Sequence, residues 1–358
     1  MSDRQAYIAF NLTDRIGPAK LERLAAAAGG SVSAAWEAYP DKVSRTGGEV
    51  DAAEEEEQAR RYGVRIVTPA DDCYPARLRG TPGAPLALYV KGDVAALSKP
   101  MVAIVGTRRA THYGRAVANR LAADLASAGW CVVSGLALGI DGDAHRGALS
   151  AKGLTVGVIG SGLDRFYPER HRDLAREIAA KGGAVASQFP FGRPADETTF
   201  PIRNHVVAAL AQGVVAVECP ERSGTLITTG IAADLGRPVM AVPGQVDSHM
   251  SAGCLALIRN GATLVRNADD IIEMLTPIAP RPQTGTGGEK TVEPDPEQPP
   301  YTVEESLVML HVDEVGISVD ELAAKTGLSA RKVNSLAMSL RLKGFVRFLP
   351  GNRIALPR

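Results

Sequence analysis

From about residue 100 onward, short apolar runs alternate with Gly-rich turns and longer helical stretches. Seven runs are strand candidates: Met101–Val105, Trp130–Val133, Thr155–Ile159, Gly183–Ala186, Val214–Val217, Pro238–Val242 and Ala262–Val265. The helical stretches between them are Gly114–Ala128, Ala144–Ala151, Arg170–Ala180, Asn204–Ala211, Thr225–Leu235 and Gly253–Asn260. Wholly apolar strands joined by helices form a parallel sheet that is covered on both faces. The pattern predicts an α/β fold with a Rossmann-like doubly wound parallel sheet, which binds ligands beyond the carboxyl ends of its strands.

Further segments flank this sheet, which we expect to occupy residues 71–276. Residues 1–70 are rich in Ala, Leu and Glu at helical spacing, which predicts a small N-terminal helical domain. Residues 277–300 are dominated by Pro, Gly and charge, as in a flexible linker. Residues 301–358 contain three helical segments and then two short apolar runs around Pro350-Gly351-Asn352. This order predicts a C-terminal winged-helix domain.

A turn within the helical domain has two interpretations. Residues 15–21 (RIGPAKL) resemble the turn of a helix-hairpin-helix, in which exposed amides can meet a phosphate. The same turn suits a plain helical packing module that makes no DNA contact.

The overall charge gives no attraction to polyanions. Lys+Arg and Asp+Glu each number 40 in 358 residues, so any nucleic-acid site must be a local patch. The four cysteines are far apart and show no metal-binding spacing, as expected of buried residues in a reducing compartment. The chain begins without a secretory pattern and contains no apolar run of membrane-spanning length, so we expect a cytoplasmic protein.

The loop after the first strand is a candidate anion site. It contains Gly106, Thr107 and Arg108, and a helix starts shortly after it. Amides at a helix start and guanidinium groups both suit a phosphate. The loop matches neither GxGxxG nor the P-loop pattern, which disfavours ordinary dinucleotide or ATP binding. The alternative for Arg108 is a surface arginine with a local partner.

The next loop begins with Ser134 and Gly135 and continues to Asp141, Asp143 and His145. The last three could hold a metal or transfer protons. Because an Asp that precedes a helix is most often a cap, we favour capping and bracing of the loop.

The loop after the third strand contains Ser161 and Gly162, whose small size admits a nucleotide. The aromatic residues that follow either stack on a base or pack the loop.

Two further regions complete the candidate site. Arg203 and Asn204 stand near a helix start, where a cation is unfavourable unless an anion compensates it. The alternative is an ion pair with a nearby acid such as Glu197. Ser223, Gly224 and Thr225 follow another apolar strand and open a helix, so their amides can receive a phosphate. The GxSxG elbow, HExxH and an evident Cys/His pair are absent, so we expect no catalytic residue, no metal and no cofactor.

These motifs together resemble the DNA processing protein A (DprA/Smf) family. The resemblance rests on seven ordered motifs across roughly 200 residues, together with a preceding Tyr-Pro: Leu88-Tyr89-Val90-Lys91-Gly92, Val105-Gly106-Thr107-Arg108, residues 134–141 (SGLALGID), Gly162-Leu163-Asp164, residues 200–204 (FPIRN), residues 223–228 (SGTLIT) and Val242-Pro243-Gly244. The N-terminal part is similar to the family's sterile-alpha-motif-like domain.

Membership would imply several functions and partners. These are binding of single-stranded DNA during natural transformation, displacement or bypass of single-strand binding protein, loading of RecA for homologous recombination, and a homodimer. The site residues implied by position are Arg108, Ser134, Gly135, Gly162, Arg203, Asn204, Ser223 and Gly224. The chain departs from the family pattern at Gln188 (usually Glu), His205 (usually Arg) and Cys254 (usually Asn). The missing arginine would remove one phosphate contact.

Two alternatives stay open. A nucleoside monophosphate phosphoribohydrolase also holds a phosphate on Gly-Thr at a helix start, but Thr228 stands where such an enzyme has its catalytic Glu. A transcription regulator would instead dock its winged helix on duplex DNA through basic residues such as Arg331, Lys332, Arg341, Lys343 and Arg347.

Overall fold

A nine-stranded sheet is the centre of the larger of two units, Met1–Arg281 and Pro282–Arg358. The computed structural model describes residues 1–13, 16–39, 50–276, 303–313, 316–342, 345–349 and 353–356. The linker expected at 277–300 lies outside the described residues. Each unit is described by itself below.

The strand order of the large sheet is β1-β2-β6-β5-β4-β3-β7-β8-β9. The strands are β1 (Arg65–Val67), β2 (Leu88–Gly92), β3 (Met101–Val105), β4 (Cys131–Ser134), β5 (Thr155–Val158), β6 (Ala184–Ser187), β7 (Gly213–Ala216), β8 (Val239–Ala241) and β9 (Thr263–Leu264). The seven from β3 to β9 are mutually parallel, and β2 joins β6 antiparallel. The predicted doubly wound parallel sheet is therefore confirmed.

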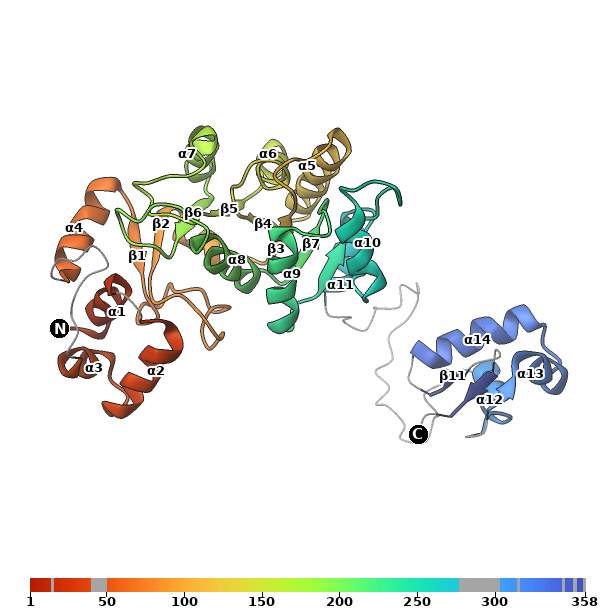
Figure 1. The fold of residues 1–358 in the computed structure, drawn as a ribbon. Coiled ribbons are helices and arrows are strands. Elements are labelled where there is room, and N and C mark those ends of the chain that lie inside the picture. Colours follow the sequence, from red (N-terminus) through yellow and green to blue (C-terminus); the bar gives the residue numbers. More distant parts are fainter. Residues whose placement is uncertain are drawn as a thin grey trace, which may run out of the picture. The chain divides into compact units, whose positions relative to one another are not determined.

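Helices cover both faces of this sheet (Figure 1). On one face lie α5 (His112–Ser127), α6 (Ile140–Ser150), α7 (Arg172–Ala180) and α11 (Ala268–Leu275); on the other lie α8 (Thr199–Leu210), α9 (Gly224–Asp234) and α10 (Ala252–Arg259). Alternate residues of the central strand β3 serve the two cores, because neighbouring side chains of a strand point to opposite faces. Val102 and Ile104 pack against α5 and α6, whereas Ala103 and Val105 pack on the α8 side.

The first 92 residues contribute the predicted helices and, in addition, two strands, β1 and β2, that the sequence pattern did not predict. The helices are α1 (Asp3–Leu12), α2 (Pro18–Ala27), α3 (Val32–Ala38) and α4 (Ala52–Tyr62). They bury Phe10 and Trp36, whose rings meet edge to face at 5.0 Å, in a cluster that also contains Tyr89 of β2. β1 lies inside the range predicted as helical, and its register pairs Ile66 with Tyr89. Of the turn at 15–21, Arg15 lies outside the described residues, and α2 starts at Pro18 after the N-cap Gly17.

The second unit contains α12 (Val303–Met309), β10 (Ile317–Ser318), α13 (Val319–Thr326), α14 (Ala330–Leu342), β11 (Arg347–Leu349) and β12 (Arg353–Ala355). Three helices and a small sheet of order β10-β12-β11 are the expected winged helix. Of its basic residues, Arg347 donates through Nε to the carbonyl of Leu356 at 3.0 Å. Lys343 lies outside the described residues.

The cysteines are free thiols; three are buried and Cys73 is partly exposed. Cys219 and Cys254 lie side by side, with 3.6 Å between their sulfur atoms.

Within the described parts of the chain, no helix combines the length and apolar character needed to cross a bilayer.

Candidate functional site

A groove opens where the chain leaves neighbouring strands β3 and β7 in opposite directions, toward α5 on one face and α9 on the other. Ligands of doubly wound sheets bind at such a switch point, beyond the carboxyl ends of the strands. The groove has ≈ 1270 Å³ of open space. Nine of the predicted site residues line it: Gly106, Thr107, Arg108, Gly135, Arg203, Asn204, Ser223, Gly224 and Thr225. The other three, Ser134, Ser161 and Gly162, do not.

The groove is positively charged. Arg108, Arg109, Arg203 and Arg222 line it, against the carboxylates of Asp141 and Glu197, which leaves an excess of two positive charges. Within the described chain, the three exposed arginines Arg108, Arg109 and Arg222 form no ion pair. The local patch that a neutral chain would need for a polyanion is therefore present here.

Arg203 differs from the expected exposed ligand at a helix start. It lies in the second turn of α8 and is only 5% exposed. Its Nη1 donates to the carbonyl oxygens of Gly135 and Val158, the latter at 2.7 Å, and its Nε donates to Asn204 Oδ1 at 3.1 Å. Glu197 is exposed and makes no ion pair with Arg203; the acid near Arg203 is Asp141 instead. Burial lowers the pKa of Arg203 to about 10, and the charge of Arg108 acts in the same direction.

Asp141 braces the loop beneath Arg203. Its Oδ2 accepts hydrogen bonds from the amides of Gly135 at 3.1 Å and Ala137 at 3.4 Å. Burial raises the pKa of Asp141, while the neighbouring Arg203 lowers it. A Cβ on Gly135 would stand 2.1 Å from Arg203 Nη1 and 2.7 Å from Asp141 Oδ2, so the close approach of these groups requires glycine there.

The metal or proton-transfer interpretation of Asp143 and His145 finds no support. Asp143 forms ion pairs with Arg115 and Arg146, and the buried His145 contacts Thr155 Oγ1 through Nδ1 at 2.7 Å. No cluster of metal-ligating side chains occurs in the part of the chain that the structure describes. Of the preferred roles, only bracing of the loop is observed, through Asp141; the predicted capping is not, because the N-cap of α6 is Gly139 and no side chain caps the helix.

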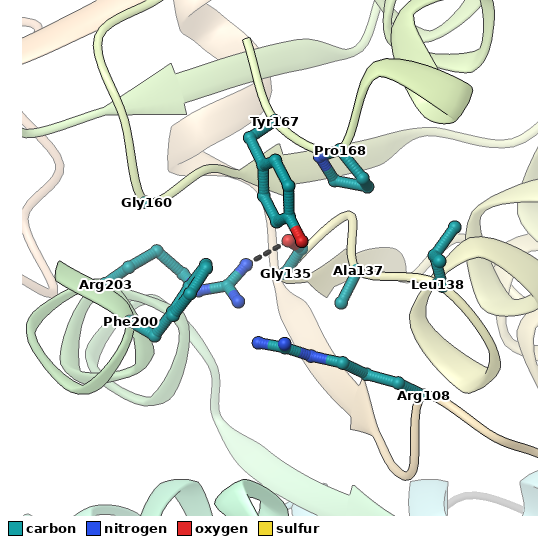
Figure 2. A pocket seen from close by; sticks show the side chains of 9 residues that line it. All are labelled: Arg108, Gly135, Ala137, Leu138, Gly160, Tyr167, Pro168, Phe200 and Arg203. Carbon is teal, nitrogen blue, oxygen red and sulfur yellow. Dashed lines mark hydrogen bonds between the residues drawn. The ribbon is translucent and has the colours of Figure 1, made fainter. Parts of the chain in front are cut away.

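Arg108 faces the free edge of the Arg203 guanidinium across a smaller pocket within the same region (Figure 2). Its guanidinium lies over the ring of Phe200, 4.7 Å from the centroid, and Tyr167 stands at the opposite rim, 49% exposed. Phe166, by contrast, packs against the α7 side of the core. Two like charges that face each other without a carboxylate between them favour an anion in that space. Phe200 was missed as a site residue, although it opens the FPIRN motif.

The start of α9 forms the opposite wall. Ser223 caps the helix by accepting the amide of Thr225 at 3.2 Å, while the amide of Gly224 has no acceptor among the described residues. A Cβ on Gly224 would meet nothing within 4 Å. The positive end of the helix dipole and a free amide therefore point to open space, as an anion site requires. Thr228, at the Glu position of the phosphoribohydrolase motif, only donates to the Gly224 carbonyl at 3.4 Å.

The start of α5 corrects part of the prediction for the first loop. Buried Glu218, after β7, accepts the amide and the hydroxyl of Thr111 at 2.9 and 2.5 Å. Thr111 in turn caps α5 by accepting the amide of Gly114. A carboxylate from a distant loop thus occupies the position predicted for a phosphate. The loop contributes Arg108 to the groove, but not the amides at the helix start.

Ser134, Ser161 and Gly162 are buried away from the groove. Ser134 donates to the carbonyl of Ile104 at 2.6 Å beneath the floor. The Gly162 amide donates to the Arg193 carbonyl at 2.8 Å, so this loop packs against residues 190–193. Small size at these positions serves close packing, which sequence alone does not distinguish from room for a ligand.

The departures from the family pattern lie outside the groove. His205 contacts the loop at Pro82 and Gly83, on a different side of α8 from Arg203. The backbone carbonyl of Gln188 accepts from Asn11 at 3.3 Å, and Cys254 packs against Cys219.

Comparison with known sequences agrees with this architecture. The family model described as DNA recombination-mediator protein A matches residues 65–276, and one described as DprA winged helix domain matches residues 292–352. Protein Smf of Escherichia coli is 35% identical over 298 residues, covering 81% of this chain and 77% of that protein. Protein Smf of Synechocystis is 30% identical and covers 98% of each chain.

Two solved structures are similar as well. DNA processing protein A of Streptococcus pneumoniae superposes with a TM-score of 0.65 and 29% identity, covering 77% of this chain and 99% of that one. The Helicobacter pylori protein, whose structure is described as giving insight into a single-stranded DNA binding mode, has a TM-score of 0.53 and 30% identity, covering 59% and 95%.

Proposed function

Since the chain belongs to the DNA recombination-mediator protein A family, we propose that it binds single-stranded DNA through phosphates held in the groove between β3 and β7. The observation that carries this proposal is the pair of guanidinium groups of Arg108 and Arg203, which face each other across a pocket with no carboxylate between them. The free amide of Gly224 at the start of α9 supplies a second phosphate contact.

The aromatic rim favours a single strand over a duplex. Phe200 and Tyr167 stand 6.0 Å apart at the pocket between the two arginines. Bases of a single strand are free to stack on such rings, whereas those of a duplex are already stacked. The contacts are with backbone groups and ring faces, so binding should depend little on sequence.

We further propose the role in which a bound strand is handed to a recombinase. In this role the protein dimerises, displaces single-strand binding protein and loads RecA for homologous recombination during natural transformation, without catalysing a reaction. The family description supports recombination mediation. RecA filament formation on strands coated with single-strand binding protein, with and without this protein, tests the role directly; unchanged filament growth would contradict it.

Fluorescence anisotropy of a labelled oligothymidylate and of a duplex tests the binding itself. Affinity for the single strand should fall steeply with salt, because each neutralised phosphate releases counterions. Arg108→Ala should weaken binding and reduce the slope of log K against log salt by about 0.7, which corresponds to one phosphate. Arg120→Ala is the matched control, since Arg120 is exposed on α5 and does not line the groove. Salt-independent binding, or equal effects of both variants, would contradict the proposed grip.

A further inference from the structure

A second cluster of arginines lies at the other end of α9. Arg77, Arg79 and Arg237 line a cavity with ≈ 920 Å³ of open space, together with Thr81, Pro82 and the last residues of α9. Arg237 follows the turn that ends α9, and Arg77 comes from the segment between β1 and β2. This cavity therefore lies at the carboxyl end of the helix whose amino end forms a wall of the groove.

Two of these arginines have no protein partner. Arg77 and Arg237 are both partly buried, and among the described residues neither side chain makes a hydrogen bond or an ion pair. The Nε of Arg237 is buried and unpartnered. Burial lowers the pKa of Arg77, and the charge of Arg237 lowers it further. A buried guanidinium nitrogen is normally paired, so the unpartnered Nε of Arg237, beside a second partly buried cation, lacks the anion that would neutralise it.

Arg79, in the same cavity, has protein partners for its guanidinium group. It donates to the carbonyls of Pro69 at 2.7 Å and Asp71 at 2.5 Å, and its guanidinium lies 5.6 Å from the ring centroid of Tyr74. Asp234, the last residue of α9, also lines the cavity, yet it forms no ion pair with Arg77 or Arg237. Its carboxylate instead limits how strongly an anion is held there.

The helix between the two sites, α9, carries no charge before its last residue. α9 has 11 residues, of which Asp234 alone is charged, and a helix of this length spans about 16 Å. Its exposed positions include Ile227 and the small residues Gly224 and Gly230. The side chains of α9 before Asp234 therefore neither repel nor bind phosphates between the two arginine sites.

We propose that Arg77 and Arg237 form a second phosphate site, which holds the backbone of the same single strand after it leaves the groove along α9. This inference rests on the proposed function and extends its footprint. It predicts a dependence on strand length, since a short oligonucleotide fills only the groove and a longer one reaches both sites.

The test measures affinity for oligothymidylates from about 4 to about 20 nucleotides with the full chain. Arg77→Ala and Arg237→Ala should each weaken binding of the long strands about fivefold and leave the shortest strand unaffected. Asp234→Asn should strengthen binding of the long strands, because it removes the opposing charge. Arg120→Ala is again the matched control, because Arg120 is exposed on α5 and lines neither the groove nor this cavity; its loss should leave affinity at every length unchanged.

The outcomes separate the second site from the groove. Arg237 also lies near the negative end of the α9 dipole, so a purely structural role would lower the melting temperature and leave the length dependence intact. Equal affinities of parent, Arg77→Ala and Arg237→Ala for long strands would overturn the second site while Arg108→Ala still reports on the groove. A further check measures the concentration of inorganic phosphate that displaces a short and a long strand. Equal concentrations for the two lengths would also overturn the second site, since the site would then bind a free anion rather than the strand.

Discussion

The guanidinium of Arg203 on α8 is hydrogen-bonded to the carbonyl oxygen of Gly135, which lies 68 residues earlier in the chain. The same nitrogen holds the carbonyl of Val158 at the end of β5. One side chain thus ties the ends of β4 and β5 to α8 while its remaining edge faces the groove. Arg203 is therefore both a part of the scaffold and a candidate ligand, and its variants must be interpreted on both grounds.

Arg203→Ala should destabilise the protein as well as weaken DNA binding. The change leaves two buried carbonyls without a donor and the buried carboxylate of Asp141 without its neighbouring cation, a loss of about 3–5 kcal/mol. Urea unfolding should show this as a lower midpoint. The exposed Arg108→Ala, measured alongside, should unfold within about 0.5 kcal/mol of the parent. Equal stability of Arg203→Ala and Arg108→Ala would contradict the buried role.

Gly135→Ala and Gly224→Ala form a matched pair with opposite expectations for stability. At Gly135 the methyl group would collide with Arg203 and Asp141, so we expect a loss of about 1–3 kcal/mol. At Gly224 there is open space, and alanine suits a helix start, so the melting temperature should not fall. Affinity for single strands should nevertheless drop about tenfold at Gly224, because the methyl group stands where a phosphate approaches the amide. Unchanged affinity would remove the start of α9 from the site.

Phe200→Leu should weaken single-strand binding by about 1–3 kcal/mol if a base stacks on the ring. Leucine retains apolar bulk beneath Arg108 but offers no aromatic face. Phe166→Leu makes the same change on a ring that packs into the core, so it should lower stability and spare affinity. Anisotropy and thermal unfolding of both variants check the contrast, and an affinity loss of the same size in both would contradict it.

Acid should destabilise the fold through His145. Burial lowers its pKa from 6.5 to about 3, so the unfolded chain binds a proton at a higher pH than the folded one. The stabilising contribution is complete above pH 6.5 and falls by about 1.4 kcal/mol per pH unit as the pH drops toward 3. Asp141 acts in the opposite sense, because its raised pKa makes the folded state the better proton acceptor.

His145→Gln isolates this effect. Thr155 Oγ1 already donates to the carbonyl of Val132 at 2.7 Å, so His145 Nδ1 must be the donor to Thr155, and a glutamine amide can replace it. Urea midpoints measured across this pH range should fall less steeply for the variant than for the parent. Parallel curves would assign the acid sensitivity to other groups.

The repeating part of the fold could be predicted because it follows from local patterns. Each strand from β3 to β9 is a short apolar run, and the end of each run marks the start of a loop. Because doubly wound sheets bind ligands at these loops, the position of the groove followed from the predicted topology. β1 and β2 were not predicted, since β1 is only three residues long and pairs antiparallel at an edge of the sheet. Their assignment depends on tertiary pairing, which has no signal of its own in the sequence.

The site was harder to predict because partners come from distant segments. No local pattern indicates that Glu218 accepts hydrogen bonds from the helix cap Thr111, or that Arg203 turns inward to Gly135. Small residues in the loop at Ser161 and Gly162 looked like room for a nucleotide, whereas they allow one loop to pack on another. Residue type and spacing identify the loops of a groove, but only the fold determines which side chains remain free.

The central position of β3 also governs when the protein can act during its own synthesis. β3 leaves the ribosome early, but its neighbour β7 and the helix after it follow about a hundred residues later along the chain. Until they emerge, Arg108 has no opposite wall and Thr111, the cap of α5, lacks the Glu218 carboxylate that accepts its amide and hydroxyl. A nascent or truncated chain that ends before residue 224 would therefore lack the wall that α9 supplies, so the proposed DNA binding requires nearly the whole sheet.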